Sequence, residues 1–147
     1  MSTAVIYARV SSTNDRQNTQ RQIEDLTRFA NSNNYNIIGT YEEHISGATK
    51  NENRTVLMEC LDFCVSQNAN FLLLSELSRL GRSTLQVLKS LEMLHEAGVS
   101  VYIQNLGIYT LNATGEANPV ASIMVTVLAE MANIEQNSQK SSTFVFK

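Results

Sequence analysis

The chain has 147 residues, enough for one domain with a substantial core and too few for two domains of ordinary size. Its 43% hydrophobic and 17% charged residues are typical of a globular protein, and they exclude a disordered chain. No apolar run is long enough to span a membrane and no signal-peptide pattern opens the chain, so we expect a cytoplasmic protein. The net charge of −3 weighs against broad electrostatic binding of nucleic acid.

The first element is a short apolar run at residues 4–10, rich in β-branched side chains, which predicts a buried strand. A loop-type cluster of small polar residues follows at 11–15. Arg9 interrupts the run two positions before the Ser11 hydroxyl, and a guanidinium in a buried strand requires an anionic partner. Because ligands of open α/β sheets bind at the carboxyl ends of strands, this stretch predicts an anion site beside a candidate nucleophile.

The rest of the chain alternates helix and strand patterns. Helices are expected at 17–31, from about Arg54, and after Ser83, which forms a capping box with Gln86. Strands are expected at 35–41, 71–74 and 99–103, with a long polar connection at 42–53. This rhythm predicts an α/β fold with a mainly parallel sheet of four to five strands and helices on both faces.

The last predicted helix covers 119–140, after a core at 1–118 and before a tail at 141–147. It is apolar most of the way round, so more than one side must be buried. We expect one row to pack on the domain: Ala121, Ile123, Val125, Leu128 and Ala132. We expect the other row to contact a partner chain: Val120, Met124, Val127, Met131 and Ile134. The alternative is a C-terminal helix packed deeply in its own domain.

Neither the cysteines nor the histidines indicate a metal site. Cys60 and Cys64 lie four apart in an apolar helical pattern without nearby ligands, so we interpret them as reduced core residues. His44 lies in the long polar connection and could approach the predicted site at Arg9 and Ser11, although a solvated loop residue is the simpler interpretation. His95 lies near the end of a helix. With no second His or Cys near His44, we expect no metal.

All seven arginines lie in the first 82 residues: Arg9, Arg16, Arg21, Arg28, Arg54, Arg79 and Arg82. A concentrated set of guanidinium groups can bind phosphate even on an acidic chain. Arg79 and Arg82 flank a glycine turn at a helix start, where backbone N–H groups also favour an anion. Together with Arg9 and Arg54 they predict a cationic site around the Ser11 hydroxyl, suited to phosphoryl transfer. The alternative for any one of them is a solvated surface charge.

Two motifs carry a resemblance to a known family. They are Tyr-Ala-Arg-Val-Ser at 7–11 and Leu-Ser-Arg-Leu-Gly-Arg at 77–82, with Gln17, Gln22, Ser46-Gly47 and Arg54 between them. From about Ala4 to Glu135 the chain resembles the catalytic domain of the serine recombinases, the resolvase and invertase family. The resemblance implies site-specific DNA strand exchange, in which a serine attacks a phosphodiester and leaves a 5′-phosphoserine and a free 3′-hydroxyl. It implies no metal or nucleotide cofactor.

The resemblance also implies a role for each matching residue. Ser11 is the nucleophile, and Ser12, one place beyond the motif, is its competitor. The residues implied to bind the phosphate or assist at the site are Arg9, Arg54, Arg79, Arg82, Gln17, Gln22 and Glu43, of which Arg54, Arg79 and Arg82 contact DNA. Glu43 stands where the family usually has Asp. The implied partners are double-stranded DNA and further copies of the chain, a homodimer and a tetramer in the synaptic complex, assembled through the last helix.

Some positions depart from the family pattern. Ser78 replaces a common Asp, and Gln136 replaces an Arg after Glu135. Glu76 lies on the same strand face two residues before Ser78 and could substitute for the Asp, although a structural glutamate is the simpler interpretation. No helix-turn-helix pattern follows residue 140, so we expect a catalytic-domain fragment. Two alternatives stay open: a dimerising module that no longer cuts DNA, and a flavodoxin-like domain that binds a nucleotide or another small anion.

Overall fold

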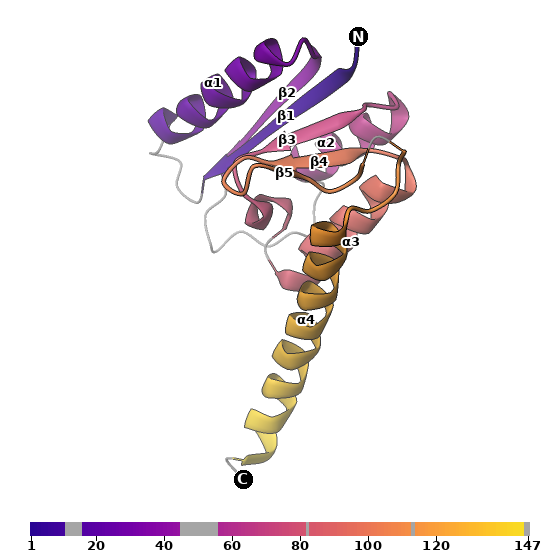
Figure 1. Ribbon diagram of the computed structural model, residues 1–147. Coiled ribbons are helices and arrows are strands. Elements are labelled where there is room, and N and C mark those ends of the chain that lie inside the picture. The colour runs from indigo at the N-terminus through magenta and orange to yellow at the C-terminus, as the bar shows by residue number, and fades with distance from the viewer. Residues whose placement is uncertain (11–15, 45–55, 82, 113, 146–147) are drawn as a thin grey trace.

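The computed structural model describes residues 1–10, 16–44, 56–81, 83–112 and 114–145, with the backbone alone at 16–18, 132–133 and 135–145. Its centre is a five-stranded sheet in the order β2-β1-β3-β4-β5 (Figure 1). The strands are β1 (Thr3–Val10), β2 (Asn36–His44), β3 (Phe71–Leu74), β4 (Ser100–Ile103) and β5 (Ile108–Tyr109). The first four are parallel and β5 is antiparallel to β4, which confirms the predicted fold class.

Helices cover both faces of this sheet. They are α1 (Arg16–Ser32), α2 (Val56–Ser66), the 3₁₀ helix η1 (Leu77–Leu80), α3 (Thr84–Glu96) and α4 (Pro119–Val145). Leu26 and Ala30 of α1 pack on one face of the sheet. α2 and α3 pack on the other face (Figure 1). The alternation of a pleated strand divides β1 between the two layers: Ile6 faces α1, whereas Val5 and Tyr7 face α2 and α3.

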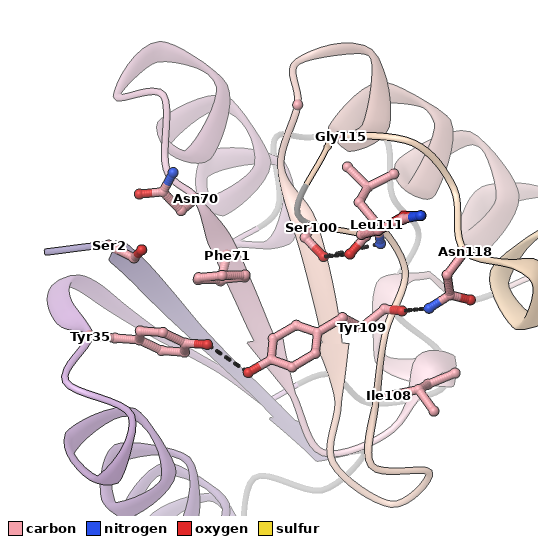
Figure 2. Close-up of a pocket in the computed structure, with 12 residues that line it drawn as sticks. Ser2, Tyr35, Asn70, Phe71, Ser100, Ile108, Tyr109, Leu111, Gly115 and Asn118 are labelled. Carbon is pink, nitrogen blue, oxygen red and sulfur yellow. Dashed lines mark hydrogen bonds between the residues drawn. The ribbon is translucent and has the colours of Figure 1, made fainter.

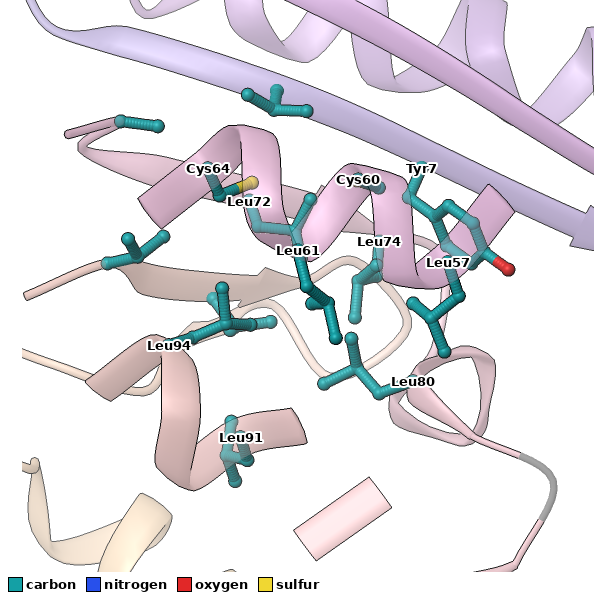
Figure 3. Packing of buried hydrophobic residues seen from close by; sticks show 14 of the residues in the cluster. Tyr7, Leu57, Cys60, Leu61, Cys64, Leu72, Leu74, Leu80, Leu91 and Leu94 are labelled. Carbon is teal, nitrogen blue, oxygen red and sulfur yellow. The ribbon is translucent and has the colours of Figure 1, made fainter. Parts of the chain in front are cut away.

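The larger half of the core lies between the sheet and the pair α2 and α3. Figure 3 shows its α2 side chains, Leu57, Cys60, Leu61 and Cys64, together with Leu72 and Leu74 of β3 and Leu91 and Leu94 of α3. Both cysteines are buried and free, as the sequence predicted. The β3 run is apolar on every residue because a central parallel strand is covered on both faces.

The ends of α3 follow from local chemistry. The Ser83 hydroxyl accepts a hydrogen bond of 3.1 Å from the Gln86 backbone N–H and so caps the first turn. Gly98 follows the last turn with a φ of +77°, a left-handed conformation that glycine adopts without strain. Both boundaries agree with the sequence prediction.

α4 differs from its prediction in two ways. It continues to Val145, so 141–145 is helical and not a tail. Met124, expected on the partner-facing row, packs against the core with Val125 and Leu128, whereas Ile123 is 64% exposed. The helix leaves the body of the domain after its first turns (Figure 1), so only those turns find a core to contact. Its exposed apolar row is therefore Val120, Ile123, Val127, Met131 and Ile134.

One short strand was not located from the sequence. β5 forms a tight hairpin with β4, closed by a hydrogen bond of 2.8 Å from Gly107 N–H to the Ile103 carbonyl. Gly107 takes a φ of +66°, which such a turn requires. Among the described residues, no helix is both long and apolar enough to cross a membrane.

Candidate active site

Arg9 lies near the carboxyl end of β1, next to η1. Its Nη2 donates a hydrogen bond of 2.9 Å to the backbone carbonyl of Ser78. Alternation along β1 places Arg9 on the same face as Tyr7, toward α2 and α3. The two partners lie 69 positions apart in sequence, and this contact joins the end of β1 to the turn that carries Arg79.

Arg79 is held at this turn by a carboxylate. Its Nη2 lies 2.7 Å from Glu76 Oε1, and its backbone N–H bonds to the Glu76 carbonyl at 3.2 Å. The Arg79 side chain is 23% exposed. Among the described residues, its Nε is buried without a hydrogen-bond partner. A guanidinium with an unused donor beside a second arginine is arranged to receive an anion.

The turn itself is fixed by packing against α3. Leu80 is fully buried, and its carbonyl accepts a hydrogen bond of 2.9 Å from the Ser90 hydroxyl. A Cβ on Gly81 would lie 2.7 Å from the Val87 backbone nitrogen and 2.8 Å from the Gln86 Cβ. The glycine between the two arginines of the motif is therefore required by close approach, because no side chain fits between η1 and α3.

Gln22 holds the backbone at Arg9. The described pairing of β1 with β3 extends as far as Ile6. Farther along β1, Gln22 of α1 bonds to the backbone: its Oε1 accepts from the Arg9 N–H at 3.3 Å, and its Nε2 donates to the Arg9 carbonyl at 3.4 Å. The Ser75 hydroxyl, just beyond β3, donates to the same Oε1 at 3.4 Å. This buried amide thus sets the position from which Arg9 reaches η1.

Glu43 connects β1, β2 and the start of α2. It is buried next to Arg9 in the sheet register, and its Oε1 accepts from the Tyr7 hydroxyl at 2.5 Å and from the Leu57 N–H at 2.9 Å. Burial, and then the hydrogen bond to Glu43, raise the pKa of Tyr7 above its usual range, so the phenol stays protonated and donates. The described contacts of Glu43 therefore position α2, the helix that begins just after Arg54.

The neighbouring polar residues of β2 face the other layer. Glu42 Oε1 accepts a hydrogen bond of 2.6 Å from the buried Thr19 hydroxyl and lies 2.7 Å from His44 Nε2. The side chains of Glu42 and His44 lie on the α1 side of the sheet, whereas Glu43 faces Tyr7 and α2. His44 thus belongs to a cluster that ties α1 to the edge of the sheet, on the opposite face from Arg9.

Several predicted site residues lie outside the described residues: Ser11, Ser12, Arg54 and Arg82, together with the side chain of Gln17. In sequence, Ser11 directly follows Val10, the last residue of β1. Of the predicted set, the structure brings Arg9, Gln22, Glu43 and Arg79 together at the carboxyl ends of the strands. Within the described ranges, no group of three or more His, Cys, Asp or Glu residues could hold a metal ion.

Sequence reasoning missed a cavity of about 710 Å³ near the amino ends of β3 and β4. Its lining includes Ser100, at the start of β4, and Asn70, just before β3 (Figure 2). The hydroxyls of Tyr35 and Tyr109 meet there at 2.6 Å, as Figure 2 shows. Burial, followed by this contact with Tyr35, raises the pKa of Tyr109 above its usual range. The aromatic residues come from separate elements, so no local motif could have indicated this cavity.

Comparison with known proteins gives a consistent result. The family model of the resolvase N-terminal domain matches residues 4–143. The transposon Tn1546 resolvase of Enterococcus faecium is 33% identical over 131 residues, 89% of this chain and 61% of that protein. The transposon Tn2501 resolvase of Escherichia coli is 28% identical over 88% of this chain and 63% of its own length. The chain thus spans less than two thirds of these curated relatives.

Solved structures share the fold. A resolvase family site-specific recombinase from Streptococcus pneumoniae aligns with a TM-score of 0.78 and 24% identity, covering 98% of this chain and 94% of that one. The N-terminal catalytic domain of TP901-1 integrase aligns with a TM-score of 0.68 and 24% identity, covering 92% and 97%. Since the family model spans nearly the whole chain, this protein belongs to the resolvase N-terminal domain family, that of the serine recombinases.

Proposed function

We propose that this chain is the catalytic domain of a site-specific DNA recombinase, with Ser11 as its nucleophile. The observation that carries the proposal is the hydrogen bond from Arg9 to the Ser78 carbonyl. It joins two arginine-bearing segments at the end of β1, directly before Ser11 in the sequence. Membership of the serine recombinase family supports the same chemistry.

In the proposed reaction, the Ser11 hydroxyl oxygen forms a bond to the phosphorus of a DNA phosphodiester, and the bond from phosphorus to the 3′ oxygen breaks. The hydroxyl proton leaves Ser11 and the 3′ oxygen takes up a proton, which gives a 5′-phosphoserine and a free 3′-hydroxyl. Attack by the 3′-hydroxyl of another strand reverses the step and rejoins the DNA. One phosphoester bond replaces another at each step, so the reaction needs no nucleotide cofactor.

The described residues would act on this reaction by charge and by position. Arg9 and Arg79 would stabilise the negative charge that develops on the non-bridging phosphate oxygens. Gln22 fixes the backbone of Arg9. Glu43 fixes the first turn of α2, the helix that follows Arg54 in the sequence. Arg54 and Arg82 would add cations from the segments before α2 and α3, and Gln17 would add hydrogen bonds from the first turn of α1.

Assembly on double-stranded DNA would use α4. A row of large apolar side chains exposed along one helix is unusual for a protein surface and typical of an interface. The row is Val120, Ile123, Val127, Met131 and Ile134. We propose that it joins two copies of the chain in a homodimer, that two dimers form a tetramer on paired recombination sites, and that the protein acts in the cytoplasm.

A dimerising module that does not cut DNA is the second candidate, and one observation favours it. The side chain of Ser78 is exposed and supplies no carboxylate to the turn between Arg9 and Arg79. The Glu76–Arg79 ion pair argues against this candidate, because it brings a carboxylate to the same turn by another route.

The test is a covalent adduct between the chain and DNA. The full chain is joined after Lys147 to a DNA-binding domain of known site, so that occupancy of the DNA can be measured separately. The duplex carries two such sites around a randomised centre with a nick, which releases a short strand after attack and traps the adduct. We expect mass spectrometry to find the DNA on Ser11, with the adduct lost in Ser11→Ala and kept in Ser12→Ala.

Two results would overturn this proposal. An adduct that survives Ser11→Ala would move the nucleophile elsewhere. A fusion that occupies its DNA fully and forms no adduct with any central sequence would favour the module that does not cut.

A further inference from the structure

Glu76 and Arg79 are joined twice. The side chains meet at 2.7 Å, and the 3.2 Å backbone hydrogen bond from the Arg79 N–H to the Glu76 carbonyl joins the same two residues. Arg28 and Asp25 on α1 form another pair at the same spacing, with 3.5 Å between the charged atoms and side chains 73% and 41% exposed. Arg79 is 23% exposed, so its guanidinium is far less free to leave its partner.

Holding one nitrogen of a guanidinium directs all of its donors, because the group is planar and rigid. Glu76 occupies Nη2 of Arg79, while Nε is buried and has no partner among the described residues. A buried donor without a partner is rare in proteins, and it fits an acceptor that arrives with a ligand. A phosphodiester oxygen is such an acceptor.

The neighbouring contacts give this pair its place in the site. Arg9 bonds to the carbonyl of Ser78, between the two residues of the pair. Ser78 brings no charge, so Glu76 is the carboxylate of this turn in the described chain. The Glu76 side chain is 40% exposed, and an ion pair that reaches the surface in this way contributes little to stability, so orientation of Arg79 is the effect by which Glu76 can matter.

We propose that Glu76 is a positioning residue for the cleavage reaction: it holds the Arg79 guanidinium so that the free donor faces the scissile phosphate. The inference rests on the proposed function and deepens it, because it names the residue that orients one of the arginines of the site. Glu76 acts through Arg79 and does not itself touch the DNA.

The first test measures cleavage. In the fusion described above, the rate of adduct formation at saturating DNA is compared for Glu76→Gln and for Asp25→Asn, which removes the matched ion pair on α1. We expect Glu76→Gln to slow the step about 10- to 100-fold, as expected of a misplaced catalytic group, without weakening DNA binding. Asp25→Asn should stay within about two-fold of the unchanged chain. Glu76→Asp, which keeps the carboxylate, should recover part of the rate.

The second test reads the guanidinium directly and does not depend on cleavage. The NMR signal of the Arg79 Nε–H group is assigned by its loss in Arg79→Lys. We expect its exchange with solvent to be slow in the chain without DNA and faster in Glu76→Gln, with Asp25→Asn unchanged. Urea unfolding of each variant shows whether the fold is kept.

The outcomes separate this inference from the proposed function. If the unchanged chain forms the Ser11 adduct and Glu76→Gln is as fast as Asp25→Asn, the inference is wrong and the function stands. An exchange rate of the Arg79 Nε–H that is unchanged in Glu76→Gln also overturns the inference. If no adduct forms while the signal responds to Glu76→Gln, the proposed function fails and the pair is structural only, which overturns the catalytic role of Glu76.

Discussion

The guanidinium of Arg9 and the backbone carbonyl of Ser78 form a 2.9 Å hydrogen bond between the end of β1 and η1. The acceptor is a main-chain atom, so the contact depends on the conformation of the turn and not on the side chain at position 78. Ser78 is exposed and its hydroxyl is not needed for this bond. At position 78, where this chain departs from the family pattern, the backbone therefore still holds Arg9, a predicted active-site arginine.

Arg9 and Ser78 are predicted to respond very differently to substitution. Arg9→Lys keeps the charge but loses the planar set of donors, so we expect adduct formation to slow about 100-fold or more. Ser78→Ala leaves the carbonyl in place and should change the rate by less than about three-fold. Single-turnover rates of the fusion on its nicked duplex measure both. A large loss in Ser78→Ala would show that the hydroxyl has a role of its own.

Glu43 is predicted to contribute mainly to stability. Its carboxylate satisfies both the buried Tyr7 hydroxyl and the Leu57 N–H. Glu43→Ala leaves both buried donors without an acceptor, and we expect it to lower the free energy of unfolding by about 2–4 kcal/mol. Glu43→Gln keeps an acceptor oxygen and should cost about half as much. Urea unfolding at pH 7 checks the order, and equal losses in the two variants would contradict this account of the contact.

Gly81 is predicted to be irreplaceable because of space and not of backbone strain. Its φ of 175° is extended, but an added methyl group would meet the Val87 nitrogen at 2.7 Å. Gly81→Ala should cost about 1–3 kcal/mol and shift η1, so cleavage should fall with stability. Gly98→Asn is the control: nothing lies within 4 Å of a Cβ there, and asparagine tolerates the left-handed conformation. Urea midpoints of the two variants should differ clearly.

The exposed row of α4 is predicted to join two copies of the chain. Val127→Glu places a charge in the middle of that row, so we expect a dimer of the full chain to dissociate at least ten-fold more readily. Ser122→Glu adds the same charge at an exposed position outside the row and should leave the assembly unchanged. Sedimentation velocity across a concentration series measures both. An unchanged chain that is monomeric at every concentration would contradict the interface.

His95 is predicted to make the fold sensitive to mild acid. Burial lowers the pKa of His95, and its Nε2 lies 2.7 Å from the buried Thr110 hydroxyl. Below the ordinary histidine pKa of about 6.5 the unfolded chain takes up a proton that the folded chain resists, so stability falls as the pH falls. The loss is complete once the pH passes below the lowered folded value. Urea midpoints between pH 5 and pH 8 should show a flatter dependence for His95→Gln.

Several features could be predicted from sequence because they depend on neighbouring residues. The run at 71–74 is a buried strand, Ser83 caps the next helix and Gly98 follows its last turn. Periodicity and capping chemistry act over one or two turns of chain, so they can be recognised in the sequence before the fold is known. The motif Leu-Ser-Arg-Leu-Gly-Arg predicted an anion site for the same reason, since its arginines and glycine lie within one turn.

Other features depended on segments that meet only in the folded chain. Gln22 of α1 bonds to the Arg9 backbone beyond Ile6, the last residue of β1 in register with β3. Met124 packs against the core and Ile123 does not. Both side chains are apolar and the helical pattern permits either, so the position of α3 decides which one is buried. The spacing of Glu76 and Arg79 in the sequence permits an ion pair, but whether the two side chains meet depends on how η1 packs.

The sequence by itself thus determined the first four strands and the main helices, the family, and the residue types expected at the site, because local periodicity, caps and short motifs encode them. Only the tertiary structure decided which side chains meet at the end of β1. Arg9 reaches Ser78 across 69 residues of chain. Such contacts are set by the distances and directions that packing imposes on whole elements, which no local pattern specifies.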